Sequence, residues 1–214
     1  IRESYPGWIV LPASHMNEFS DTKESMPFWT NIYAKCANDV IKQVNFLFEV
    51  KWRIETALAS PDMEWYLQAI EQLPSEDANG LDNATYQKLL GLKLSLLNTY
   101  RFKGADDDYI HQLADIEARA SQLTYEHQRQ LNYIKCLYAI STLNYTNVQK
   151  IIDSWNLRTF DYQGHLWKAG ILIEVGQLRE AQVMLRDLLK SVKRNILTSR
   201  YSALLSSVRS AIQL

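Results

Sequence analysis

One helical pattern occurs twice within residues 131–190, and it constrains the fold more than any other feature of the chain. In the clearer copy, Ala169 is followed by Ala181, with Gly176 between them. Small side chains let two antiparallel helices approach closely at their crossing. Glycine tolerates the left-handed conformation that commonly ends a helix. The apolar face then continues at helical spacing through Leu185, so the pattern predicts a helical hairpin.

The second copy lies thirty residues earlier in the chain. A shift by this amount makes Ala139 equivalent to Ala169, and it places Ile151 and Trp155 in the following helix. Periods of this size indicate stacked helical units, because a single hairpin cannot bury its apolar face alone. We therefore expect consecutive hairpins that pack on one another.

With these features the stretch resembles the tetratricopeptide repeat family. The resemblance covers one clear repeat, Leu166–Lys190, and one degenerate repeat before it. It rests on the small residues Ala169 and Ala181, the turn residue Gly176, and the large apolar residues Leu172 and Leu185. It implies a right-handed solenoid that binds a peptide or protein or serves as an assembly arm, and it implies no catalytic chemistry.

The rest of the chain has an all-α composition. Only 7 Gly and 5 Pro occur in 214 residues, too few for the many turns of an all-β protein. We predict about nine helices, arranged as antiparallel hairpins in a short right-handed solenoid over residues 25–214. Residues 1–24 begin with a Tyr-Pro-Gly turn signal and lack helical periodicity. We interpret them as a linker or docking segment from a preceding domain of a larger multidomain protein.

Caps and apolar periodicity predict the helix boundaries. The first helical region, residues 25–54, reads as one long helix or as two helices with an unmarked break. Further helices are expected at residues 61–73, 82–102, 106–120 and 199–214. In the last of these, the apolar face consists of Leu204, Leu205, Val208 and Ile212.

Charge and cysteine content narrow the classes of partner. The net charge of −1 gives no global preference for nucleic acid, but residues 151–214 hold 9 basic and 5 acidic side chains. Within this region, four cations are candidates for contact with nucleic acid or an acidic protein surface, with a solvated face as the alternative: Arg186, Lys190, Lys193 and Arg194. The two cysteines lie far apart in sequence, and no apolar run approaches the ~20 residues of a membrane helix. We expect a cytoplasmic protein without membrane contact.

Aromatic side chains gather where the two repeats meet. Trp155, Phe160, Tyr162 and Trp167 could form a ligand groove, or they could fill the core between helices. They are the candidate residues for binding a protein or peptide partner.

A catalytic hypothesis arises from Arg158 and His165, which are separated by six residues. This spacing resembles the signature of HEPN ribonucleases, which are also all-helical and act as dimers. In that chemistry the histidine moves a proton while the arginine holds the charge that develops on the phosphate. The four histidines show no spacing typical of metal ligands, and no phosphate-binding glycine loop is present. No metal or cofactor is predicted.

The leading functional hypothesis is a non-catalytic region for protein interaction, oligomerisation or sensing. Such arms look similar to those attached to bacterial anti-phage defence and signalling effectors, by analogy of fold. The alternatives are the HEPN-like ribonuclease and a nucleic-acid-binding helical solenoid. A homo-oligomer is also compatible with the leading hypothesis.

Overall fold

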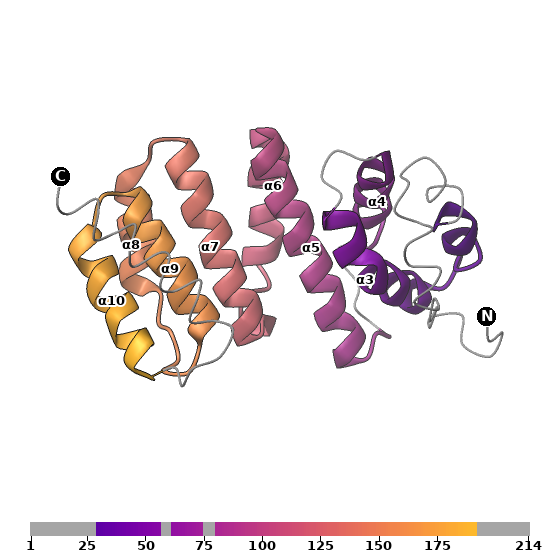
Figure 1. Ribbon diagram of the computed structural model, residues 1–214. Coiled ribbons are helices and arrows are strands. Elements are labelled where there is room, and N and C mark those ends of the chain that lie inside the picture. The colour runs from indigo at the N-terminus through magenta and orange to yellow at the C-terminus, as the bar shows by residue number, and fades with distance from the viewer. Residues whose placement is uncertain (1–28, 57–60, 75–79, 192–214) are drawn as a thin grey trace. The chain divides into compact units, whose positions relative to one another are not determined.

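The computed structural model describes residues 29–56, 61–74 and 80–191, and it confirms the all-α prediction for these ranges, which contain no strand (Figure 1). A short helical segment at residues 29–34 comes first. The helices that follow are α3 (Val40–Thr56), α4 (Pro61–Glu71), α5 (Asn83–Lys103), α6 (Asp106–Glu117), the 3-10 turn η1 (Ala120–Gln122), α7 (Tyr125–Ser141), α8 (Tyr145–Ser154), α9 (Tyr162–Glu174) and α10 (Leu178–Ser191). The predictions for residues 1–24 and 199–214 lie outside the described residues.

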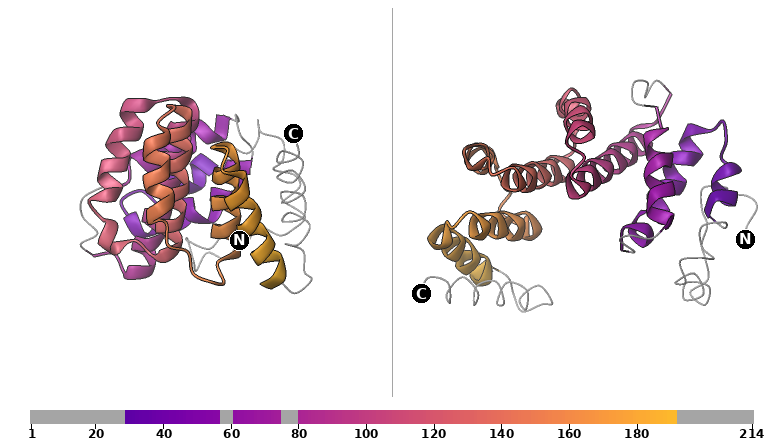
Figure 2. Two further views of the ribbon diagram at one scale, coloured as in Figure 1. Left: turned by 90° about the vertical axis from the view of Figure 1, so that its left-hand side faces the viewer. Right: turned by 90° about the horizontal axis from the view of Figure 1, so that it is seen from above.

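The chain divides into two compact units, one up to Thr124 and one from Tyr125 onward. In unit 1, α5 packs against α3, α4 and α6. In unit 2, α7 packs against α8 and α9, and α9 packs against α10. Both views of Figure 2 show α9 and α10 lying side by side.

The first predicted helical region contains two helical segments rather than one long helix. Residues 35–39 interrupt it, and Asn38 has a left-handed backbone with φ of 70°. Asparagine adopts this conformation more readily than most residues. The carboxylate of Asp39 then accepts a hydrogen bond of 3.1 Å from the backbone N–H of Lys42, which satisfies a free donor in the first turn of α3.

Helix α5 forms the centre of unit 1, and its boundaries lie one residue after those predicted, 82–102. Asp82 caps its start by accepting a hydrogen bond of 2.9 Å from the Thr85 N–H, and Gly104 ends it with φ of 70°. Every residue from Leu89 to Leu97 is buried. A helix that is buried on all sides must be surrounded by other elements, which explains its contacts with α3, α4 and α6.

The two hairpins of unit 2 share one turn geometry, and it aligns them at a spacing of 33 residues, where the sequence pattern predicts thirty. Leu143, with φ of 56°, and Gly176, with φ of 80°, both follow the end of a helix and stand 33 residues apart. In each turn the next residue donates its N–H to the carbonyl five residues earlier, at 2.7 Å from Asn144 and 2.8 Å from Gln177. This bond satisfies a terminal carbonyl of the helix, as in a Schellman motif. At this spacing Ala169 aligns with Cys136 and not with Ala139, so the alignment of the turns differs from the expected equivalence by three positions.

The predicted close contact of α9 and α10 is supported by complete burial of Ala169 and Ala181, which both have 0% exposure. At the 33-residue spacing their counterparts are Cys136 and Val148, and these are also fully buried. The first hairpin therefore fills the same positions with slightly larger side chains. Burial raises the pKa of the Cys136 thiol to about 12.

Two lysines cap the C-terminal ends of helices that precede their own. Lys93 of α5 donates to the carbonyls of Ile70 and Leu73, while Lys168 of α9 donates to those of Ile152 and Trp155. The carbonyls at a helix end lack partners within the helix and carry partial negative charge, so an ammonium group is favourable there. Burial lowers the pKa of both lysines. In each case the lysine ties one helix to the end of the helix before it.

Candidate interaction site

The buried carboxylate of Asp161 organises the loop between α8 and α9. It is 8% exposed and caps α9 by accepting the Gly164 N–H at 2.9 Å. It also accepts a hydrogen bond of 2.7 Å from the Tyr125 hydroxyl and forms an ion pair with Arg129, both on α7. Burial alone would raise the pKa of the Asp161 carboxyl, but the hydrogen bonds from Tyr125, Gly164 and Arg129 outweigh it and hold the pKa below its ordinary value.

Tyr125 fixes the same loop at a second point. Its hydroxyl oxygen accepts a hydrogen bond of 2.9 Å from the backbone N–H of Arg158, and its ring lies 4.0 Å from the guanidinium carbon of that residue. Between Arg158 and Asp161, the side chain of Phe160 is 79% exposed. The loop therefore presents a large apolar side chain to solvent on a backbone held at both ends.

Further aromatic and arginine side chains follow along α7 and α9. The Arg129 guanidinium carbon lies 5.1 Å from the ring centre of Trp167. Trp167 in turn stacks on Tyr133, with ring centres 4.8 Å apart and planes inclined by 14°. We call the set of Tyr125, Arg129, Tyr133, Arg158 and Trp167 the arginine–aromatic face. Because its charged and aromatic members contact one another, it is largely ordered before any partner binds.

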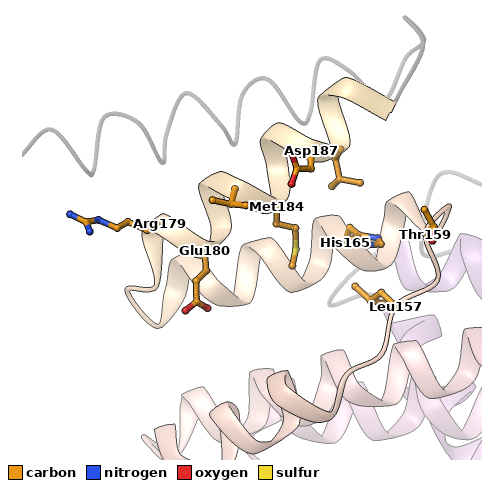
Figure 3. Close-up of a pocket in the computed structure, with 9 residues that line it drawn as sticks. Leu157, Thr159, His165, Arg179, Glu180, Met184 and Asp187 are labelled. Atoms are coloured by element: carbon orange, nitrogen blue, oxygen red, sulfur yellow. The ribbon is translucent and has the colours of Figure 1, made fainter.

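A separate groove of about 680 Å³ lies along α10 and the start of α9 (Figure 3). Figure 3 shows Met184 reaching from α10 toward α9, on which His165 lies, while Arg179 points outward at the other end. The residues that line the groove are Leu157, Thr159, His165, Arg179, Glu180, Val183, Met184, Asp187 and Leu188. None of them belongs to the arginine–aromatic face.

The hydrogen bond of His165 to the backbone defines which of its ring nitrogens is the donor. Its Nδ1 lies 2.7 Å from the carbonyl oxygen of Asp161. A carbonyl oxygen can only accept, so Nδ1 donates and, in the neutral ring, Nε2 keeps its lone pair.

The two residues of the catalytic hypothesis have different surroundings. Arg158 is exposed and lies against the ring of Tyr125. His165 lines the groove along α10, and Arg158 is not among the lining residues. The lining of this groove therefore includes one member of the pair, His165, and not the other.

The other predicted site residues divide between core and surface. Trp155 is 3% exposed and belongs to the core of unit 2, against which Tyr162 and Trp167 also pack. Arg186 and Lys190 are exposed on α10, and Lys190 pairs with Asp187 at 3.0 Å. Lys193 and Arg194 lie outside the described residues.

Sequence reasoning missed four residues that build the site, namely Tyr125, Arg129, Tyr133 and Asp161. The only local signal was Asp161 itself, an aspartate at a helix start, where it is a preferred cap. Its partners on α7 stand 32 and 36 residues away in sequence, so no local pattern could identify them.

Comparison with known proteins found no match to any protein family, curated protein or solved structure. Within the described ranges, no His, Cys, Asp or Glu side chains cluster in a way that could hold a metal ion. No helix among the described residues is long and apolar enough to cross a membrane.

Proposed function

We propose that unit 2 is a non-catalytic protein-interaction region that binds a segment of a partner protein through the arginine–aromatic face and Phe160. The observation that carries this proposal is the 79% exposure of Phe160 on a loop anchored by Tyr125 and Asp161. Leaving a phenylalanine in water gives up the ~1.5–3 kcal/mol that its burial would contribute to stability. A bound partner would recover this free energy.

The types of residue in the arginine–aromatic face, and the contacts that hold them in place, favour binding. Arginine, tyrosine and tryptophan dominate the energetic centres of protein interfaces, and a side chain that is ordered beforehand loses less entropy on binding. Arg158 already stacks on Tyr125, so the edge of its guanidinium, with its N–H donors, stays available to a carboxylate. We therefore expect the bound segment to combine an apolar side chain with an acidic one.

A displayed random-peptide library, selected against the full chain, tests the proposal. The selected peptides should combine an aromatic or aliphatic residue with an aspartate or glutamate. Their affinity should fall about tenfold or more in Phe160→Ala and in Arg158→Ala, because each change removes a contact of hot-spot type. Phe102→Ala is the matched control, since Phe102 is 71% exposed in unit 1 and should not affect binding. Peptides that bind all three variants with equal affinity would overturn the proposed site.

The ribonuclease alternative is tested separately. We expect the full chain to leave single-stranded RNA intact, because Arg158 lies against the ring of Tyr125 whereas His165 lines the groove along α10, whose lining does not include Arg158. Cleavage by the parent that disappears in both Arg158→Ala and His165→Ala would replace the interaction proposal with a catalytic one.

A further inference from the structure

The groove along α10 exposes an apolar surface that the described residues do not cover. Val183 is 55% exposed, and Met184 and Leu157 line the same space. The buried face of α10 consists of Ala181, Leu185 and Leu188, which contribute to the core of unit 2. Helix α10 thus has apolar side chains both toward the core and toward solvent, and the second set indicates a further contact.

The charge of the groove matches one segment of this chain. Two acidic residues, Glu180 and Asp187, and one basic residue, Arg179, line the groove, so its lining has a slight negative balance even though Asp187 also pairs with Lys190. The 23 residues that follow α10, residues 192–214, contain four basic side chains and no acidic one. The first two of these cations, Lys193 and Arg194, come directly after the C-terminal end of α10, where positive charge is favourable.

The same segment carries a stripe of apolar residues at helical spacing. Leu204, Leu205, Val208 and Ile212 fall within about 100° of one another on a helix, while Ser206 and Ser210 fall on the opposite side. Such a stripe must be buried against another element.

The connection is long enough for the segment to return along α10. The seven residues 192–198 can span up to roughly 23 Å when extended, and the 14 residues of α10 extend over about 21 Å. A helix of residues 199–214 would be about 24 Å long and would therefore cover the whole of α10.

We propose that residues 199–214 of this chain dock in the groove between α10 and the start of α9, with their apolar stripe against Val183 and Met184. In this arrangement the apolar stripe of the segment covers the apolar lining of the groove. The groove shares no residue with the arginine–aromatic face, so this proposal stands or falls independently of the partner-binding function.

Disulfide trapping in the full chain tests the docking. Val183→Cys is combined in turn with a cysteine at each position of the segment, and mild oxidation is followed on non-reducing gels. The native cysteines Cys36 and Cys136 are 1% and 0% exposed, so they should not interfere. We expect intramolecular cross-links with Leu204→Cys, Leu205→Cys or Val208→Cys to form about tenfold faster than with Ser206→Cys or Ser210→Cys, because docking raises the effective concentration on one side only.

A second measurement separates docking from simple proximity. The rate at which a maleimide labels Val183→Cys should rise several-fold when Val208→Asp is added, because an aspartate in the apolar stripe opposes docking. The matched control for Val183→Cys is Leu143→Cys, because Leu143 is 72% exposed on the other hairpin of unit 2. Cross-links that show no helical periodicity, that form equally with Leu143→Cys, or that join two chains would each overturn the proposal.

Discussion

The substitution of glycine by alanine at two positions of α9 should have opposite effects on stability. The reason is that only one of the two positions lies against the carboxylate of Asp161. Gly170 and Gly164 are both within the helix, and neither has a positive φ. A Cβ atom at Gly170 would meet nothing within 4 Å. Alanine there should stabilise unit 2 by about 0.5–1 kcal/mol, because it lowers the entropy of the unfolded chain and favours the helix.

A Cβ atom at Gly164 would instead collide with the carboxylate of Asp161 and lie 2.6 Å from Cδ2 of Leu157. The carboxylate cannot move away cheaply, because Tyr125 and Arg129 hold it. Overpacking of this kind costs about 1–3 kcal/mol, and the loss of a hydrogen bond to a buried charge costs about 1–3 kcal/mol more. We therefore expect Gly164→Ala to destabilise unit 2 by about 2–6 kcal/mol.

Urea unfolding of the parent and both variants, followed by circular dichroism, measures the two effects with one assay. The slope of the free energy against urea should stay unchanged, so that the midpoint reports stability alone. A value for Gly164→Ala within about 0.5 kcal/mol of the parent would show that Asp161 is not held as described.

Three further changes probe other parts of the structure. Leu143→Gly should stabilise the chain by about 1 kcal/mol in urea unfolding, because Leu143 has a left-handed backbone and is 72% exposed; a loss of stability would contradict this. Lys168→Met should lower the free energy of unfolding by about 1–3 kcal/mol, because two carbonyls lose their hydrogen-bond donor. The exposed control Lys150→Met should stay within about 0.5 kcal/mol of the parent. The pKa of Cys136 is raised from 9.0 to about 12 in the folded state, so its contribution to stability is complete below about pH 9 and is lost as the pH rises toward 12. Between pH 8 and 10.5 the free energy of unfolding of the parent should therefore fall by about 2 kcal/mol more than that of Cys136→Ala. Equal decreases in the two proteins would refute this.

The sequence predicted helix ends well where glycine or a capping residue marks them. Gly104 and Gly176 both end helices with a left-handed backbone, and Asp82 caps α5. The turn at Leu143 could not be recognised, because a leucine seldom adopts this conformation. Because the first turn carries no glycine, the sequence pattern predicts a spacing of thirty residues, whereas the two turns stand 33 residues apart.

The candidate site depended on contacts between distant parts of the chain. Phe160 and Arg158 were identified from the sequence, but the roles expected for them were a groove and a phosphate contact. What fixes their loop is Asp161, whose partners lie a full hairpin away on α7. Because the contacts of Asp161 with Tyr125 and Arg129 form only when α7 and α9 pack together, sequence periodicity and local motifs do not indicate them.

The most direct test of the proposed interaction function is the affinity of a selected peptide for the full chain and for Phe160→Ala, measured by calorimetry beside the control Phe102→Ala. We predict a loss of affinity of about tenfold or more in Phe160→Ala and none in Phe102→Ala, because only the first side chain stands on the anchored loop. Equal affinities for the parent and Phe160→Ala would contradict the assignment of this loop as the partner-binding site.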